Sequence, residues 1–381
     1  MTKTGVSSVA VIGAGIIGLS CAMALADRGL RVTLYDKQWP PRGASWAAAG
    51  MLAPAFEAAG DEGVHPLLFD LCAASADLWS DWASHLQNRS GVQSGYHPGP
   101  SLALARTPLE TQRLRAIAER LKNTKQQPTA IDAQDLSQAE PGLTGTIEAA
   151  YWLPSDGQAD NRQTLSALVK IASEHPQISV KSHSAPLKAI ASGLDHAGHD
   201  ATLVCAGWGT GVVAVEENGQ NFSLLNWETT LDEIDCYGGQ MLSVEPIEGG
   251  PRRTARAGAL YIVPKRDRIV IGATTQPGEA PEAADPETTA RLKAQAAELF
   301  PALAKARTID SWAGVRPGTS NHAPLLGATA TPGLYVASGH YRNGILLAPI
   351  TARIMADMIV DGVISPLAAA FAPSAFLTTR V

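Results

Sequence analysis

Residues 9–29 read VAVIGAGIIGLSCAMALADRG, and this stretch decides the fold. Its first four residues are apolar and end at a glycine, which is typical of a buried parallel strand. Small and apolar residues then recur with helical spacing over 17–28. A second apolar strand is predicted at 31–35, directly before Asp36. This part of the chain therefore predicts a βαβ unit with two parallel strands.

Three glycines between the first strand and the helix fit the pattern G-x-G-x-x-G. Gly13 permits a tight turn, Gly15 lets the backbone approach a pyrophosphate, and Gly18 lets the helix pack closely on the strand. A pyrophosphate there would meet the unpaired N–H groups and the positive end of the helix. Asp36 lies 18 residues beyond Gly18, where a carboxylate can accept hydrogen bonds from both ribose hydroxyls. The unit predicts a bound dinucleotide, which is either NAD or FAD.

The composition is that of a globular protein, with 45% hydrophobic and 17% charged residues. A length of 381 residues exceeds what one compact core usually holds, so two domains are expected. The net charge of −6, without a basic run, disfavours nucleic acid or an anionic membrane as a partner. The four cysteines lack the spacing of a zinc site or a disulfide framework. We expect reduced thiols, no metal site and a cytoplasmic protein.

The stretch from Ser8 to Ala26 is apolar enough to resemble a signal sequence or a membrane span. However, it contains the three glycines of the turn and continues directly into Asp27 and Arg28. A strand, a turn and a helix explain these residues better, so we expect no membrane segment.

Two further features favour FAD over NAD. Residues 42–51 supply a second set of small side chains soon after Asp36, where the phosphates and the ring of a flavin would lie. Residues 203–207 form a late apolar strand that ends in Ala-Gly, as is usual in the cofactor domains of flavoproteins.

The remaining patterns predict an α/β (α+β) fold in which a mixed-sheet substrate domain is inserted into a Rossmann-like FAD-binding domain. Helices are expected at 65–90, 107–125, 162–174, 286–299 and 345–361, and strands at 101–105, 149–153, 239–245, 259–264, 268–273 and 334–337. The FAD-binding domain is assigned residues 1–85, 150–210 and 311–381, and the substrate domain residues 86–149 and 211–310.

Several segments of the chain resemble the D-amino acid oxidase superfamily, and within it the glycine oxidases of thiamine biosynthesis. Besides the opening glycine motif they are SWAAAGMLAP (45–54), GQML (239–242), LYIVPKRDRIVIGATT (260–275), WAGVRPGTSNHAPLLG (312–327) and SGHYRNGILLAPITA (338–352). The last two are the most specific, and together the segments cover nearly the whole chain.

The resemblance implies roles for particular residues. Arg316 matches an arginine that binds the substrate carboxylate, Arg342 a second arginine beside the flavin, and Tyr261 a tyrosine of the substrate pocket. A helix N-terminus beginning near His340 would stabilise the anionic reduced flavin. The residues implied to bind FAD are Gly13, Gly15, Ile16, Ile17, Gly18, Asp36, Lys37, Ala44, Ser45, Ala49, Gly50, Met51, Leu187, Gly207, His340, Tyr341, Asn343, Gly344, Ile345 and Leu346. Without the resemblance, Arg316 would be interpreted as a structural ion-pair partner and Tyr261 as a core residue.

The sequence departs from its relatives at several places, among them a short stretch at 189–201 and a tight hairpin at 265–268. Residues 159–162 read Ala-Asp-Asn-Arg, where relatives often have Asp-Pro-Arg, and Thr275 stands where glycine oxidases can have a bulkier apolar residue. Together these changes permit an amine that is larger or more polar than glycine.

The resemblance implies oxidation of a small amine or amino acid, with glycine favoured, by hydride transfer to flavin N5. The products would be an oxo acid, ammonia and, with molecular oxygen as the acceptor, hydrogen peroxide. The alternatives are a D-amino acid or sarcosine-type dehydrogenase with another acceptor, a flavoenzyme that modifies a protein-bound amine, an NAD-dependent dehydrogenase, and a binding module without catalysis. The sequence leaves open whether the chain forms a homo-oligomer.

Overall fold

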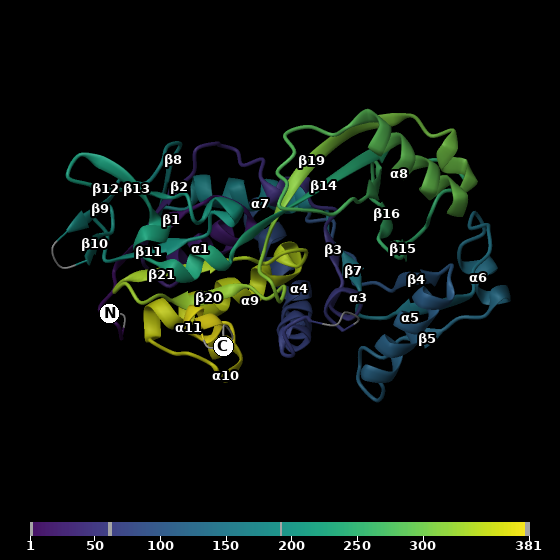
Figure 1. Ribbon diagram of the computed structural model, residues 1–381, viewed down its shortest axis with the longest axis horizontal. Coiled ribbons are helices and arrows are strands. Elements are labelled where there is room, and N and C mark those ends of the chain that lie inside the picture. The colour runs from purple at the N-terminus through teal and green to yellow at the C-terminus, as the bar shows by residue number, and fades with distance from the viewer. Residues whose placement is uncertain (1–2, 60–62, 191–192, 378–381) are drawn as a thin grey trace.

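The computed structural model describes residues 3–59, 63–190 and 193–377. Two large sheets lie toward opposite ends of an elongated molecule (Figure 1). Within the described residues, no helix combines the length and the apolar character needed to cross a membrane. All four cysteines are free thiols, and Cys236 alone among them is not buried.

The first sheet has six strands in the order β20-β21-β11-β1-β2-β8. All neighbours are parallel except β20 with β21. This is the open parallel arrangement that the βαβ motif predicts, in which ligands bind at the carboxyl ends of the strands. The strands are β1 (Ser8–Ile12), β2 (Arg31–Tyr35), β8 (Ile178–Lys181), β11 (Ala201–Val204), β20 (Leu325–Ala328) and β21 (Leu334–Ser338).

Four helices pack around this sheet. Helix α1 contacts α7 and α9, and α4 also contacts α7 and α9. Helix α1 is buried at all but two of its residues, which explains why its sequence is apolar on every side. The helices are α1 (Ile16–Asp27), α4 (Leu68–Ser90), α7 (Asn161–Glu174) and α9 (Gly344–Ala356), and a π-helical turn (Asp357–Asp361) follows α9.

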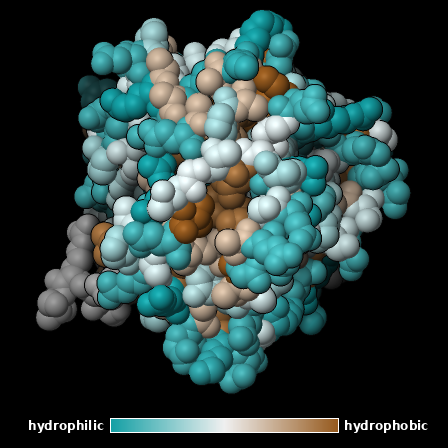
Figure 2. All heavy atoms as spheres, turned by 90° about the vertical axis from the view of Figure 1, so that its right-hand side faces the viewer, coloured by the Kyte–Doolittle hydropathy of each residue, from teal (hydrophilic) through white to brown (hydrophobic). Residues whose placement is uncertain are grey.

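The second large sheet has nine strands in the order β18-β14-β17-β16-β15-β4-β6-β5, and β19 pairs with β14. Helix α8 (Pro286–Leu299) packs against β14, β16 and β17. Figure 2 views this end of the molecule, where the surface is mostly hydrophilic and hydrophobic side chains gather in a small central hollow. The strands are β4 (Ser101–Ala105), β5 (Thr129–Ala130), β6 (Ala149–Leu153), β14 (Asp235–Val244), β15 (Ala255–Ala257), β16 (Leu260–Pro264), β17 (Ile269–Gly272), β18 (Gln276–Pro277) and β19 (Thr308–Gly318).

Smaller elements complete the molecule. Strands β9 and β12 pair in a four-stranded sheet, and β3 pairs with β7. These elements are β3 (Met51–Leu52), β7 (Gly157–Gln158), β9 (Leu187–Ile190), β10 (Gly193–Asp195), β12 (Ala214–Glu217), β13 (Gln220–Ser223), α2 (Ala44–Ala47), α3 (Pro54–Ala58), α5 (Pro108–Arg120), α6 (Ala133–Ala139), α10 (Pro366–Ala369) and α11 (Pro373–Leu377). The domain boundaries stay a prediction.

The α/β fold class is confirmed, and the helix predicted at 286–299 matches α8. The helix predicted at 107–125 ends earlier, at Arg120, and the one predicted at 65–90 begins at Leu68. Strand β19 was not predicted, because its glycines and Pro317 are unusual in a strand. Among the strands that the structure describes, β19 pairs with β14 alone, and an edge position tolerates a proline, which has no N–H group to donate.

Candidate active site

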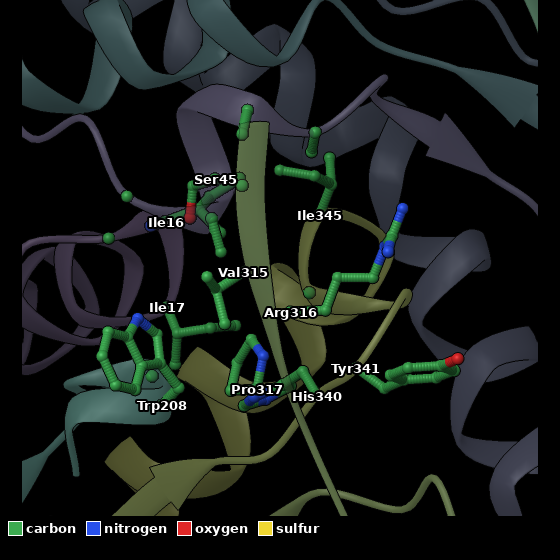
Figure 3. Close-up of a pocket in the computed structure, with 18 of the residues that line it drawn as sticks. Ile16, Ile17, Ser45, Trp208, Val315, Arg316, Pro317, His340, Tyr341 and Ile345 are labelled. Atoms are coloured by element: carbon green, nitrogen blue, oxygen red, sulfur yellow. Dashed lines mark hydrogen bonds between the residues drawn. The ribbon is translucent and has the colours of Figure 1, made fainter. Parts of the chain in front are cut away.

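A cavity of about 570 Å³ takes its lining from both large sheets. At one end lie the turn after β1 and the residue that follows β2, and at the other end lie β16, β19 and the start of α9. In Figure 3, the Arg316 side chain lies on the same side of β19 as Ile345 and Tyr341 and points away from Tyr341, and Ile16, Ile17 and Trp208 lie across the strand. The volume is within the usual range of small-molecule sites.

The turn between β1 and α1 depends on its glycines. Gly13 has φ +102°, and a Cβ atom there would lie 2.5 Å from the carbonyl oxygen of Cys205. A Cβ atom at Gly18 would lie 1.8 Å from the carbonyl oxygen of Gly13, so only glycine lets α1 start so close to the turn. The first N–H groups of α1 have no partner within the helix, which makes this turn suited to an anion.

Asp36 follows β2 and lies beside the turn. Its Oδ2 accepts a hydrogen bond from the Ala14 N–H at 2.6 Å, and its Oδ1 accepts one from the Gln38 N–H at 2.9 Å. These bonds fix the carboxylate at the cavity wall, where each oxygen keeps a lone pair for another donor.

Helix α2 covers the same end of the cavity. The Oγ of Ser45 accepts a hydrogen bond from the N–H of Ile16 at 3.0 Å, which joins α2 to the first turn of α1. Gly50 has φ +75°, and a Cβ atom there would lie 2.1 Å from the carbonyl oxygen of Ala159. The chain therefore needs glycine at this position to pass beside the start of α7.

Arg316 lies on β19 at the other end of the cavity. Its Nη1 donates to the carbonyl oxygens of Gly238 and Thr274, each at 3.3 Å. No ion pair joins this guanidinium to a carboxylate within the residues that the structure describes. A Cβ atom at Gly239 would lie 2.5 Å from Nη1, so this glycine makes room for the arginine.

Tyr261 on β16 is buried beside Arg316. Its hydroxyl would lie 2.5 Å from a Cβ atom at Gly272, so this glycine also makes room for a polar group of the cavity. Burial raises the pKa of the Tyr261 phenol, against the opposing effect of Arg316 and the other arginines nearby. The phenol is therefore neutral and can donate a hydrogen bond.

Arg342 precedes α9 and has a carboxylate partner. Its Nη2 donates to the Oγ1 of Thr275 at 2.9 Å, and its Nη1 lies 3.5 Å from Oε2 of Glu57. Glu57 also forms a close ion pair with the buried Arg256. Burial alone would raise the pKa of Glu57, but Arg256 and Arg342 lower it to about 2. Sequence analysis missed Glu57 because no motif marks a lone glutamate whose two partners are distant in the chain.

The turn before α9 closes the cavity. The N–H of Tyr341 donates to the carbonyl oxygen of Pro317 at 2.6 Å, and the Tyr341 ring stacks on His322 with centroids 4.3 Å apart. His340 is buried with its Nε2 3.1 Å from Oγ1 of Thr351, and burial lowers its pKa to about 3. The imidazole is thus neutral at ordinary pH.

Most of the residues predicted for the site do line the cavity, but four do not. Gly18 packs against the turn, and Leu187 is buried in β9. Asn343 is buried before α9, and the carbonyl oxygen of Leu346 accepts hydrogen bonds from Ser75 and Trp79. The cavity residues that sequence analysis did not name include Glu57, Trp208, Met241, Ala259, Ala273, Val315 and Pro317.

Comparison with known proteins identifies the family to which this chain belongs. The family model described as FAD dependent oxidoreductase (DAO) matches residues 8–358, so the chain belongs to this family. It is 34% identical over 383 residues to a bifunctional protein ThiO/ThiG of Synechocystis sp., with 98% of this chain and 54% of the relative covered. The chain spans about half the length of these bifunctional relatives.

The chain is also similar to shorter relatives. It is 28% identical to a glycine oxidase of Geobacillus kaustophilus, over 92% of both chains. The crystal structure of glycine oxidase from Geobacillus kaustophilus superposes with a TM-score of 0.80, covering 92% of this chain and 94% of that chain. The chain belongs to a family of FAD-dependent oxidoreductases, which favours FAD over the NAD-dependent alternative.

The cavity fits the cofactor of the family. Gly13, Gly15 and Ile17 at the start of α1 line the cavity, and a helix N-terminus suits a pyrophosphate. A single cavity joins this end to the start of α9 and to Arg316, as an elongated dinucleotide requires.

Proposed function

We propose that this enzyme oxidises the carbon–nitrogen bond of a small amino acid, with glycine favoured, and passes the electrons to oxygen. The observation that carries the proposal is Arg316, a cavity-lining guanidinium that contacts two carbonyl oxygens and the neutral Tyr261 hydroxyl and forms no ion pair within the described residues. Guanidinium binds a planar carboxylate through two parallel hydrogen bonds, and such charge-assisted bonds are among the stronger polar contacts. The similarity to glycine oxidases supports a substrate that carries both an amine and a carboxylate.

In this proposal Arg316 binds the substrate carboxylate, and the neutral phenol of Tyr261 donates a further hydrogen bond to it. These two contacts orient the α-carbon so that its hydride leaves toward the cofactor, and orientation of this kind contributes much of the rate. FAD supplies the hydride acceptor, N5 of its ring system. The oxidised imine is hydrolysed to the oxo acid and ammonia.

The buried carboxylate in the cavity does not suit a general base. Glu57 is bound by Arg256 and Arg342, which keep its pKa near 2. A carboxylate of such low proton affinity is a poor acceptor for a proton of the substrate amine. We therefore infer that the amine enters uncharged and that Glu57 holds Arg342 in place.

The cofactor contacts belong to the same proposal. The turn at Gly13 to Gly18 and the hydroxyl of Ser45 would bind the pyrophosphate, and Asp36 the ribose. The N-terminus of α9 would place its N–H groups at the pyrimidine edge of the flavin and stabilise the negative charge of the reduced form. Lys37, Ala44, Ala49, Met51 and Gly207, which line the same cavity, complete the proposed set.

Release of hydrogen peroxide tests substrate and acceptor together. Glycine, sarcosine, D-alanine and D-proline are each offered to the purified holoenzyme in air. We expect peroxide with at least one of them and the highest kcat/KM with glycine. Turnover that appears only with an artificial electron acceptor would instead support the dehydrogenase alternative. No turnover with any amine, under either condition, would contradict the proposal and favour a protein-bound amine.

A further inference from the structure

Three consecutive carbonyl groups of α2 are held by side chains from distant parts of the chain. The Nδ2 of Asn161 donates to the carbonyl oxygens of Ser45 at 2.9 Å and Trp46 at 2.8 Å. The Nε1 of Trp312 donates to that of Ala47 at 2.8 Å. Helix α2 has only four residues, so most of its carbonyl groups have no partner within the helix. These two side chains therefore supply the bonds that the helix itself cannot.

Both donors are buried, with 1% of Asn161 and 7% of Trp312 exposed. The bonds are consequently shielded from water, which would otherwise replace a lost donor. Arg162 adds a third contact, because its guanidinium lies 3.8 Å from the ring centroid of Trp46 and 4.6 Å from that of Trp312. A cation between two aromatic faces holds the middle of α2 against β19.

The helix held in this way connects the two ends of the cavity. Ser45 accepts the hydrogen bond of Ile16 at the start of α1. On the opposite side, Ala47 packs so closely on β19 that a Cβ atom at Gly314 would lie 2.5 Å from its own. Gly314 lies two residues before Arg316 on the same strand. A displacement of α2 would thus disturb both the turn that faces the pyrophosphate and the strand that carries the arginine.

Asn161 has no evident part in forming the helix that it begins. Asp160 caps α7, since its Oδ1 accepts from the N–H groups of Arg162 at 3.0 Å and Gln163 at 3.1 Å. Proline is favoured at the first position of a helix, and Asp160 has an extended backbone (φ −79°, ψ 104°), close to the region that a residue before proline favours. Helix formation therefore leaves the amide side chain of Asn161 unexplained, and its contacts to α2 explain it.

We propose that Asn161 and Trp312 are positioning residues that hold α2 over the bound FAD and thereby slow its release. The proposal rests on the placement of FAD in the function proposed above. It does not depend on which amine is oxidised.

The test measures FAD dissociation from the holoenzyme after dilution, by the recovery of flavin fluorescence, well below the unfolding temperature of each variant. Asn161→Pro removes the amide group that donates to the carbonyl oxygens of Ser45 and Trp46 and keeps the helix start. Trp312→Phe removes the indole N–H and keeps an aromatic ring. Ser166→Ala, on the exposed side of α7, is the matched control. We expect each of the first two variants to release FAD roughly tenfold faster, with a shifted visible absorption band, and the control to match the wild type.

Dissociation rates of both variants within about twofold of the wild type would overturn the proposal. A lower unfolding temperature with an unchanged dissociation rate would also overturn it, because that result assigns both side chains to folding alone. Absence of bound FAD in the wild type would instead contradict the proposed function, so the two failures are distinguishable.

Discussion

Two arginines line the same cavity but have different electrostatic surroundings. The partners of Arg316 within the described residues are two carbonyl oxygens and the neutral Tyr261 hydroxyl, so its charge is available to a ligand. Arg342 lies near Glu57, which is also bound by Arg256, so its charge is partly neutralised within the protein. This difference, rather than the mere presence of arginine, selects Arg316 as the proposed carboxylate partner.

Replacement of Arg316 should therefore affect substrate binding alone. We expect Arg316→Ala to raise KM by about 100-fold, since two charge-assisted hydrogen bonds are lost. Arg316→Lys should give an intermediate KM, because an ammonium cannot bind both carboxylate oxygens in the same way. Steady-state kinetics measures KM, and the absorbance of bound flavin checks that the cofactor is retained. An unchanged KM in Arg316→Ala would show that the carboxylate binds elsewhere.

Glu57→Gln should destabilise the protein by about 3 kcal/mol, because it leaves two arginines without their shared carboxylate. The effect depends on pH with a definite sign. The folded protein holds the pKa of Glu57 at about 2, below its ordinary value of 4.5. The carboxylate therefore contributes its full stabilisation above pH 4.5 and loses it as the pH falls toward 2.

Urea unfolding at several pH values measures this contribution. The difference in unfolding free energy between the wild type and Glu57→Gln should be constant above about pH 5 and should shrink at lower pH. A difference that grew on acidification would contradict the assigned ion pairs.

At the scale of elements, the pairing of β14 with β19 shapes the substrate end of the cavity. Gly239 on β14 lies opposite Gly314 on β19, and Tyr237 lies opposite Arg316. The two glycines leave the space into which Arg316 and Ala47 extend. Glycine is required at both positions because a Cβ atom at Gly239 would overlap Arg316 and one at Gly314 would overlap Ala47.

We expect Gly239→Ala to displace the Arg316 guanidinium, since the added Cβ atom would lie 2.5 Å from Nη1. KM for the amino acid should rise about tenfold while FAD stays bound. Ser243→Ala on the same strand is the control, because its buried hydroxyl has no hydrogen-bond partner in the described structure. Equal KM values for the two variants would indicate that the Arg316 position tolerates this shift.

At the scale of the whole molecule, the cavity takes its walls from both sheets, so the cofactor contacts segments that are far apart in the chain. A ligand that binds only the folded state stabilises it by mass action. The proposed site therefore couples the stability of the molecule to its cofactor.

Removal of FAD should lower the unfolding temperature. At a hundredfold excess of FAD over its Kd, we expect a stabilisation of roughly 2.7 kcal/mol over the apoprotein. FMN should stabilise much less, because it lacks the adenosine half that would reach Asp36. Thermal unfolding with no flavin, FAD and FMN makes this comparison. Equal effects of FAD and FMN would contradict the placement of the ribose.

The sequence by itself determined the βαβ unit and the cofactor turn, because both depend on local patterns. Strand periodicity, helical spacing and the three glycines act within about 30 residues of one another. Resemblance added Arg316 and Arg342, which occur in long, specific motifs. Tertiary structure decided the rest, since Glu57 meets Arg256 and Asn161 meets α2 only after segments distant in the chain have packed together. Strand β19 likewise follows from its edge position in the sheet, which no local pattern encodes.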